Sequence, residues 1–314
     1  MNSNKPKHLV TGGAGFLGSH LIDRLIKKGE EVICIDNYST GQKDNIIHWF
    51  NHPNFEFIRH DITEPIQLEV NNIWHFACPA SPVHYQANPI KTSKTIFLGT
   101  YNMLGLAKRT NSKFILASTS EIYGDPEIHP QPESYRGYVN PIGPRSCYDE
   151  GKRMAEALTF DYKRIHNVDA KILRIFNTYG PRMHPKDGRV ISNFIFQALN
   201  KKNLTVYGNG KQTRSFCYVD DLIDGIIKFM SNDYAGPLNL GNPCEYTILE
   251  IANIIKNKIN KNLDIKFFSL PKDDPCRRKP LIELAKNKIN WTPNTSFDKG
   301  IDLTIEYFKN LENF

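Results

Sequence analysis

The sequence predicts an α/β fold in which a doubly wound parallel sheet is followed by a smaller, irregular α/β part. Two observations predict it. Up to about residue 180, short apolar runs alternate with amphipathic segments long enough to be crossover helices. After that point the alternation loosens and turn residues become frequent. We therefore expect one domain at residues 1–180, to which some later segments return, and a second domain at 181–314 packed directly on it.

The elements of the first domain follow one another as strand, helix, strand. The helix expected at 16–28 joins the first two strands, and the helices expected at 92–109 and 148–166 are long and amphipathic. In the second domain we expect helices at 190–201, 220–230, 248–259 and 297–311, separated by short strands. The strands expected in the parallel sheet are 8–11, 31–36, 55–59, 72–76, 113–118 and 170–176.

Composition and charge limit the classes of protein that remain. The chain has 314 residues, of which 40% are hydrophobic and 23% are charged, and this excludes a disordered or collagen-like protein. Its formal net charge of +7 favours anionic partners, but the basic residues are dispersed along the chain. We therefore expect a small anionic substrate and no nucleic-acid partner.

Membrane and metal signals are missing from the sequence. No stretch approaches the roughly 18 consecutive apolar residues of a membrane span, and the N-terminal residues pass into a strand pattern without a signal-peptide segment. The six cysteines are scattered without a CxxC pair, and no HExxH motif occurs. We expect a cytoplasmic protein with no membrane contact, reduced thiols and no metal site.

A glycine motif lies in the first strand-turn-helix unit. Gly12, Gly15 and Gly18 follow a GxxGxxG spacing directly after the strand 8–11, and a helix begins at once with Phe16 and Leu17. Such glycines allow a tight turn, the close approach of a pyrophosphate and helix packing on the strand. A purely structural turn is the alternative, but here a second strand follows and ends in an acidic residue.

That acidic residue is Asp36. A carboxylate at the end of the second strand accepts hydrogen bonds from ribose hydroxyls and repels an additional phosphate, so NAD is favoured over NADP. Together with the glycine motif, it predicts a Rossmann-type dinucleotide-binding domain. The further cofactor contacts that we expect are Asn37, Asp61 and Ile62.

Tyr148 and Lys152 lie four residues apart, on one face of the helix expected at 148–166. The spacing alone is weak evidence, because it recurs at Tyr207 and Lys211, where no helix is expected. A tyrosine has a pKa of about 10, so acting as a base near neutral pH requires that pKa to be lowered. The ammonium of Lys152 and a positively charged nicotinamide are suitable causes.

These features resemble the extended short-chain dehydrogenase/reductase family, whose members act mostly on nucleotide sugars. The sequence is similar above all to the UDP-glucuronic acid decarboxylases, and the similarity extends over nearly the whole chain. The segments that carry it include ACPASPVHYQANPIKT, STSEIYGDPEIHPQPESY, NPIGPRSCYDEGKRMAE, RIFNTYGPRM, DGRVISNFIFQAL, VYGNGKQTRSFCYVDDL and DDPCRRKP.

The resemblance implies NAD-dependent decarboxylation of UDP-glucuronate to UDP-xylose. In that reaction the C4 hydroxyl is first oxidised, CO₂ leaves from the resulting β-keto acid, C5 is reprotonated, and the hydride returns to C4. The resemblance assigns acid-base chemistry to Tyr148 and a hydrogen bond to the C4 oxygen to Thr119. By the same resemblance, Lys152 holds the ribose and lowers the Tyr148 pKa, so Tyr148 and Lys152 also count as cofactor contacts. Glu121 acts on the substrate carboxylate or on a water beside it, and Ser120 is a catalytic residue whose role stays open. The role of Glu121 as base, orienting group or electrostatic destabiliser stays open.

Arginines in the second half suit a diphosphate and a carboxylate, because guanidinium groups donate paired hydrogen bonds. By resemblance, Arg214 and one of Arg277 and Arg278 reach the nucleotide sugar, and Arg278 assists the chemistry at C5. Asn177 resembles a contact to the diphosphate or the sugar. The complete expected substrate set is Asn177, Arg182, Arg189, Arg214, Arg277 and Arg278.

Alternatives and departures from the family pattern stay open. Sugar 4,6-dehydratases resemble Thr-Asp-Glu where this chain has Thr119-Ser120-Glu121, and 4-epimerases carry neither acid. The missing aspartate weakens the dehydratase interpretation, and a 4-epimerase or 4,6-dehydratase stays the alternative. An NAD-binding regulatory protein is a further alternative. Leu281 stands where the family usually has an aspartate, and Arg136 and Tyr138 interrupt a usual Tyr-Trp-Gly-Asn stretch.

The resemblance also implies an assembly. Relatives dimerise through a four-helix bundle made by the helices expected at 92–109 and 148–166, so we expect a homodimer. Animal relatives carry an N-terminal membrane anchor, and the absence of such a segment from this sequence agrees with the cytoplasmic expectation.

Overall fold

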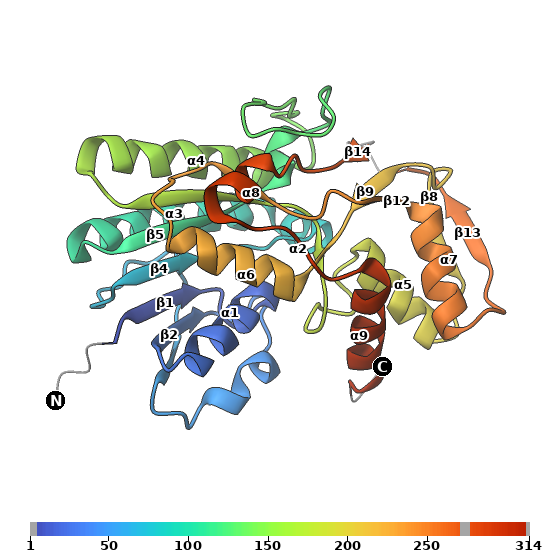
Figure 1. The fold of residues 1–314 in the computed structure, drawn as a ribbon, viewed down its shortest axis with the longest axis horizontal. Coiled ribbons are helices and arrows are strands. Elements are labelled where there is room, and N and C mark those ends of the chain that lie inside the picture. The colour runs from blue at the N-terminus through green and yellow to red at the C-terminus, as the bar shows by residue number, and fades with distance from the viewer. Residues whose placement is uncertain (1–4, 271–276, 312–314) are drawn as a thin grey trace.

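A seven-stranded parallel sheet forms the centre of the computed structural model, which describes residues 5–270 and 277–311 (Figure 1). The strand order is β11-β6-β5-β4-β1-β2-β3. Six of these strands come from the first 180 residues, and β11 comes from the second half of the chain. Their bounds are β1 (Lys7–Thr11), β2 (Glu31–Asp36), β3 (Phe55–Arg59), β4 (Asn72–His75), β5 (Lys113–Thr119), β6 (Ala170–Ile175) and β11 (Leu238–Leu240).

Helices cover both faces of this sheet, because successive strand residues point to opposite sides. Leu9 of β1 is buried with Met103 and Ala155, against α3 (Pro89–Thr110) and α4 (Ser146–His166). The next residue, Val10, is buried on the other side with Ile22 and Leu222. That side is covered by α1 (Phe16–Lys27) and α6 (Val219–Met230), and α8 (Glu283–Ile289) packs beside α6 and β11 (Figure 1).

The remaining elements form a smaller lobe beside the carboxyl ends of the strands (Figure 1). Its helices are α5 (Val190–Leu199), α7 (Ile248–Ile259) and α9 (Phe297–Lys309). Thr247 and Glu250 form a reciprocal capping box that fixes the start of α7. The short strands of this lobe pair as β13 (Ile265–Phe268) with β8 (Leu204–Tyr207), as β9 (Thr213–Ser215) between β12 (Glu245–Thr247) and β14 (Arg277–Arg278), and as β10 (Cys217–Tyr218) with β7 (Thr178–Tyr179).

Short helices fill the connections that face the carboxyl edge of the sheet. After β2 the chain makes two 3₁₀ turns, η1 (Lys43–Asn45) and η2 (Ile47–Trp49), and after β4 it forms α2 (Pro82–Ala87). After β5 it forms the 3₁₀ helix η3 (Ser120–Tyr123). Of these connections, η3 carries Ser120 and Glu121, two of the expected catalytic residues.

The predicted fold class is confirmed, and the differences lie at element ends. The helix expected at 92–109 begins earlier, at Pro89, because proline is suited to the first helical position and the Asn88 side chain caps the Lys91 amide. The strand expected at 170–176 ends at Ile175, and the helix expected at 297–311 ends at Lys309. None of the helices in the described ranges has the length and apolarity of a membrane span.

Candidate active site

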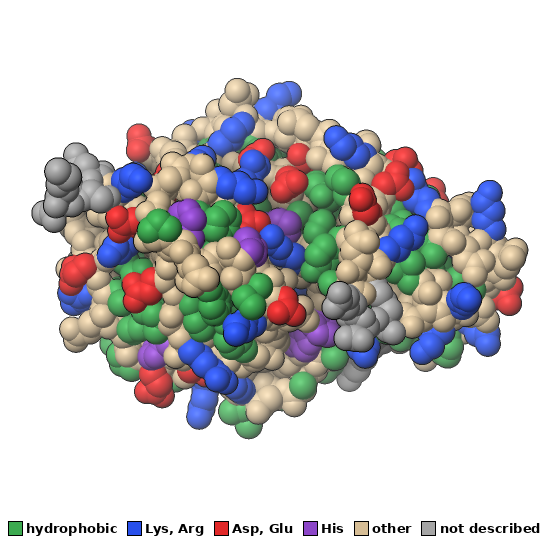
Figure 2. All heavy atoms as spheres, turned by 90° about the horizontal axis from the view of Figure 1, so that it is seen from below, with side chains coloured by type: hydrophobic (Ala, Val, Ile, Leu, Met, Phe, Trp, Pro, Cys, Tyr) green, Lys and Arg blue, Asp and Glu red, His purple; other side chains and the backbone are tan. Residues whose placement is uncertain are grey.

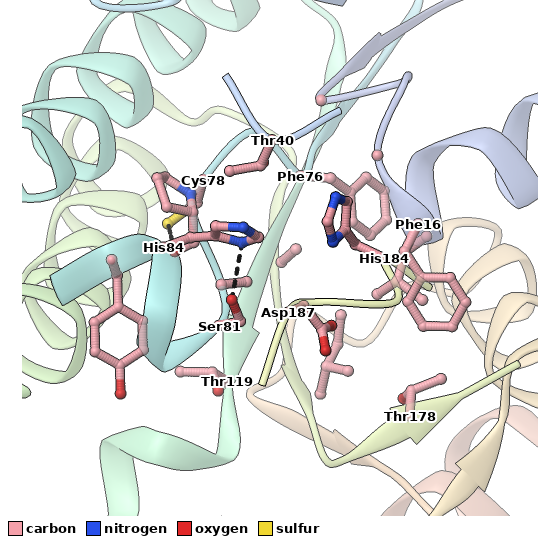
Figure 3. Close-up of a pocket in the computed structure, with 18 of the residues that line it drawn as sticks. Phe16, Thr40, Phe76, Cys78, Ser81, His84, Thr119, Thr178, His184 and Asp187 are labelled. Atoms are coloured by element: carbon pink, nitrogen blue, oxygen red, sulfur yellow. Dashed lines mark hydrogen bonds between the residues drawn. The ribbon is translucent and has the colours of Figure 1, made fainter. Parts of the chain in front are cut away.

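A cavity of about 390 Å³ lies between the carboxyl edge of the sheet and the smaller lobe. Residues of both halves line it, as Figure 3 shows: Phe16 and Phe76 come from the sheet side, and His184 and Asp187 come from the segment before α5. Thr119, at the end of β5, faces the same space. Sites of this kind are typical of the carboxyl edge of open parallel sheets.

The glycine turn forms one wall of this cavity. Gly12 has a φ of 69°, and a Cβ there would lie 2.8 Å from the Ala77 backbone. At Gly18 a Cβ would lie 2.3 Å from the Gly12 carbonyl oxygen, so the helix can approach the turn only without a side chain. Gly15 caps α1 without a side-chain hydrogen bond, which leaves the helix N-terminus available to an anion. Phe16 and Leu17 line the cavity beside them.

Asp36 lies next to the turn, with its carboxylate held in place. It accepts hydrogen bonds from the amides of Ala14 at 3.0 Å and Tyr38 at 2.8 Å. Burial raises the Asp36 pKa, while the backbone hydrogen bonds oppose that rise. A carboxylate beside a glycine cradle and a bare helix N-terminus fits the ribose and pyrophosphate of a dinucleotide.

The other expected cofactor contacts support this wall. Asn37 lines the cavity and donates to Asp61 at 2.9 Å, and Asp61 also accepts from the amide and hydroxyl of Thr63. Asp61 lines a neighbouring depression and braces Asn37 through this hydrogen bond. Ile62 is buried and lines the main cavity.

Tyr148 and Lys152 lie on the first turns of α4 and are both buried. The Tyr148 hydroxyl is hydrogen-bonded with the side chain of Thr119. Lys152 donates to the Ala117 carbonyl at 2.7 Å, and its Nζ lies 5.9 Å from the centroid of the Tyr148 ring. β5 and α4 thus bring the three predicted residues together at one edge of the cavity.

Burial changes the acidity of Tyr148 in the direction opposite to what a base requires. Burial raises the Tyr148 pKa, the thiol of Cys78 raises it further, and the hydrogen bond from Thr119 lowers it. The sequence-based expectation of a lowered pKa is therefore not met by the chain alone, because the ammonium of Lys152 is directed to a backbone carbonyl.

Glu121, which follows Thr119 by two residues, is surrounded by arginines. Arg278 contacts both of its carboxylate oxygens, at 3.2 and 3.4 Å, and Arg145 forms a further ion pair with it. Burial acts to raise the Glu121 pKa, but Arg278, Arg145 and Arg214 outweigh it and lower the pKa to about 2. Arg278 also donates to Ser120 at 3.1 Å and to the Gly124 carbonyl at 2.8 Å.

The remaining expected substrate residues differ in where the structure places them. Asn177, Arg189 and Arg214 line the cavity, and Arg189 donates across it to the Ala80 carbonyl at 2.9 Å. Arg182 lines it too, but one of its nitrogens donates to Asp23 of α1 at 2.7 Å. Arg277 is exposed and is not among the residues that line the cavity.

Sequence reasoning missed two buried residues and one arginine of this site. Tyr85 of α2 stacks on Tyr148 at 4.9 Å with an interplanar angle of 6°. Arg145, which lines the cavity, lies one helical turn before Tyr148. Asp149 follows Tyr148 directly and is buried. The signal for Arg145 was its spacing of three residues from Tyr148, which places both on one helix face.

Within the described ranges, no group of histidine, cysteine, aspartate and glutamate residues is arranged to hold a metal ion. Figure 3 shows two histidines that line the cavity, His84 and His184, and His84 is hydrogen-bonded with Ser81 at 2.9 Å. The hydrogen bond between Ser81 and His84 closes the first turn of α2.

Comparison with known proteins agrees with this geometry. A family model described as GDP-mannose 4,6 dehydratase matches residues 9–304. UDP-glucuronic acid decarboxylase 4 of Arabidopsis thaliana is 58% identical over 301 residues, which cover 96% of this chain and 68% of the relative. UDP-glucuronic acid decarboxylase 1 of Xenopus tropicalis is 53% identical over 311 residues, which cover 99% of this chain and 74% of the relative.

Solved structures give the same result at lower identity. The UDP-glucuronic acid 4-epimerase of Bacillus cereus, in complex with UDP-glucuronic acid and NAD, has a TM-score of 0.88 at 28% identity and covers 98% of this chain and 100% of its own. A dTDP-glucose 4,6-dehydratase of Streptomyces venezuelae with NAD bound has a TM-score of 0.88 at 26% identity and covers 96% and 97%.

The seven-stranded parallel sheet and the family match over residues 9–304 are those of an extended short-chain dehydrogenase/reductase. The relatives that are 53–58% identical over nearly the whole chain define a narrower group within that class. The chain belongs to the family of the UDP-glucuronic acid decarboxylases.

Proposed function

We propose that this protein is an NAD-dependent enzyme that decarboxylates UDP-glucuronate to UDP-xylose. One observation carries the proposal. The Thr119-Ser120-Glu121 edge has the Tyr148 hydroxyl at one end and the Arg278 fork at the other, within one cavity. The two ends suit the two parts of the chemistry, which are proton transfer at a hydroxyl and handling of a carboxylate.

The first part concerns the C4 hydroxyl of the sugar. Direct loss of CO₂ from the sugar acid would leave an unstabilised carbanion at C5, whereas a C4 ketone delocalises that charge. The glycine turn and Asp36 would hold NAD, which when bound supplies the acceptor and donor of the hydride at C4 and a positive charge that favours ionised Tyr148. Tyr148 takes the proton of the C4 hydroxyl, and Thr119 orients the oxygen.

The second part concerns the carboxylate at C5. Arg278 is fully buried and is fixed by Ser120, Glu121 and Gly124. A guanidinium held in this way is pre-organised for an anionic group, while ionised Glu121 limits its net charge. Glu121 therefore acts as an ionised group that fixes the arginines and influences the carboxylate, in the charge state that its low pKa dictates.

A 4-epimerase that acts on the same nucleotide sugar acid is the second candidate. The observation in its favour is the structural similarity to the Bacillus cereus protein, which is a UDP-glucuronic acid 4-epimerase. A 4-epimerase retains the carboxylate and gives UDP-galacturonate, so the two candidates differ in their products.

The experiment is to load the purified protein with NAD, incubate it with UDP-glucuronate and follow CO₂ release and the nucleotide-sugar products. We expect CO₂ and a UDP-pentose in equal amounts. Tyr148→Phe is the matched control for contaminating activity. Unchanged substrate with intact, NAD-loaded protein would contradict the proposal, and UDP-galacturonate without CO₂ would establish the 4-epimerase.

A homodimer is part of this proposal, and the surface of α3 and α4 supports it. Ile90, Phe97 and Tyr101 of α3 are 72%, 39% and 50% exposed, and Met154 and Ile165 of α4 are 48% and 71% exposed. The spacings of seven and eleven residues place each set on one face of its helix. An apolar surface of this kind is typical of a subunit interface.

The cytoplasmic location, and the absence of membrane and nucleic-acid partners, stay predictions. Figure 2 shows basic and acidic side chains interspersed over the face that it presents. This mixed charge suits small anionic ligands better than a polyanion. Cell fractionation and a salt-dependent DNA-binding assay would test these points.

A further inference from the structure

Asp149 is a buried carboxyl group to which the reaction outlined above gives no role. It lies next to Tyr148 on the first turn of α4, and 8% of its side chain is exposed. Its Oδ2 lies 3.7 Å from Nε of Arg145. Within the described part of the chain, no hydrogen bond reaches its Oδ1, although that atom is buried. A buried carboxyl with one oxygen unsatisfied is costly, so its presence needs an explanation.

Arg145 connects this carboxyl to the candidate site. Its guanidinium faces Asp149 through Nε and forms the ion pair with Glu121 through Nη2. Its Cζ also lies 6.0 Å from the centroid of the Tyr85 ring, which stacks on Tyr148. Arg145 therefore contacts two carboxyl groups, Glu121, which lines the cavity, and Asp149, which is not among the lining residues.

Charged and titratable groups face Asp149 from four elements. The pKa of Asp149 is raised to about 7, chiefly by burial and also by the charge of Glu121, while Arg145 and Arg278 act against the rise. The facing groups are Glu121 of η3, Arg278 of β14, Tyr85 of α2, and Arg145, Cys147 and Glu150 of α4.

We propose that Asp149 is a positioning residue for decarboxylation. It holds Arg145 through the contact with Nε and offsets part of the positive charge of this arginine. The proposal rests on the proposed function, because it concerns the substrate carboxylate. That carboxylate loses its charge when it leaves as CO₂. If a guanidinium forms a strong pair with this carboxylate, it stabilises the bound substrate more than the transition state. The pair therefore slows decarboxylation. By pairing with Nε of Arg145, Asp149 keeps the guanidinium on Glu121 and offsets part of its positive charge.

The test is the isosteric substitution Asp149→Asn, studied in the NAD-loaded protein. We expect kcat to fall roughly tenfold to a hundredfold, because Arg145 loses the charge of Asp149 and stabilises the substrate carboxylate more than the transition state. We expect KM for UDP-glucuronate to fall as well, because Arg145 becomes free to pair with the substrate carboxylate. The dissociation constant of UDP-glucose, which has no carboxylate, should stay unchanged.

The pH profile is the second readout. In the wild-type protein, kcat should change near neutral pH as Asp149 ionises, and Asp149→Asn should lose that limb. Asp161→Asn is the matched control, because Asp161 pairs with Arg164 on the same helix at an exposed position remote from the cavity. It should leave kcat, KM and the pH profile as in the wild-type protein.

Two results would overturn the inference while the wild-type protein decarboxylates UDP-glucuronate normally. One is an Asp149→Asn variant with unchanged kcat and pH profile. The other is a variant whose affinities for UDP-glucuronate and UDP-glucose change by the same factor, as for a purely structural carboxyl. Failure of the wild-type protein to release CO₂ would instead overturn the proposed function, so the two failures are distinguishable.

Discussion

Tyr148 is the single residue on which the proposed chemistry depends most. Its substitution Tyr148→Phe removes the hydroxyl that is hydrogen-bonded with Thr119 and little volume. General acid-base groups contribute about 10²- to 10⁴-fold to rate, so we expect a loss of that size in turnover of UDP-glucuronate. NAD content and melting temperature should stay close to those of the wild-type protein, because the cofactor wall is on other elements.

A tyrosine on the same helix gives the matched control. Tyr162 of α4 is half-buried and contacts Tyr101 and His166, away from the cavity. Tyr162→Phe should keep full turnover. If Tyr148→Phe retained near-normal turnover, the acid-base role of Tyr148 would be wrong.

Glu121 predicts a pH-dependent contribution to stability. Its pKa of about 2 in the folded protein is below its ordinary value of 4.5, so the folded state favours the ionised form. The stabilisation is therefore fully present above about pH 4.5 and is lost as the pH falls towards 2. We expect Glu121→Gln to lower the free energy of unfolding by about 3–5 kcal/mol at pH 7, as for a broken buried ion pair.

Urea unfolding at pH 7 and at pH 3 checks the sign of this effect. The difference between the wild-type protein and Glu121→Gln should shrink at pH 3, where the wild-type carboxyl begins to be protonated. A difference of equal size at both values of pH would mean that packing, and not the ion pairs with Arg278 and Arg145, sets the cost.

At the scale of the elements, the close packing of α1 on the glycine turn predicts unequal effects of two glycine substitutions. A Cβ at Gly18 would lie 2.3 Å from a backbone oxygen, so Gly18→Ala must move the turn. We expect it to abolish NAD binding, measured by calorimetric titration. At Gly105 of α3 a Cβ meets nothing within 4 Å.

Gly105→Ala is accordingly the matched control. It should keep NAD binding and raise the free energy of unfolding by roughly 0.5–1 kcal/mol, because glycine loses more backbone freedom in a helix than alanine. Retained NAD affinity in Gly18→Ala would show that the turn tolerates the shift, contrary to this expectation.

Local patterns account for what the sequence could predict. The turn at Gly12, the acid at Asp36 and the pair of Tyr148 and Lys152 depend on spacing within one or two elements, and the structure brings them to one cavity. β11 escaped prediction because three residues carry too little periodicity. Tyr85 escaped because its stacking on Tyr148 joins two helices that lie far apart in the sequence.

The adjacent pair of Arg277 and Arg278 shows a different limit of prediction from the sequence. Successive strand residues point to opposite sides, so of two adjacent arginines only one can face inward. Which one does so depends on the pairing of β14 with β9, which no local pattern fixes. The structure buries Arg278 and exposes Arg277.

At the scale of the whole molecule, contacts across the cavity hold the sheet and the smaller lobe together. Arg189 reaches the Ala80 carbonyl, Arg182 reaches Asp23, and Arg278 reaches Ser120 and Glu121. The chain also returns to the sheet through α6, β11 and α8. The positive residues of the second half therefore both complete the cavity and close the molecule around it.

The outer surface of α3 and α4 predicts the assembly. These helices bury one face on the sheet and leave Phe97 and Tyr101 exposed, and the Tyr101 ring contacts that of Tyr162. Light scattering should give a mass near twice that of the 36.0 kDa chain. Phe97→Glu should shift the protein towards the mass of one chain, because a buried interface does not accommodate an unpaired charge.

Phe267→Glu, at an aromatic residue of β13 that is 54% exposed, is the control and should keep the dimer. A wild-type mass of one chain at micromolar concentration would rule out the homodimer, and a dimer that persists in Phe97→Glu would place its interface elsewhere.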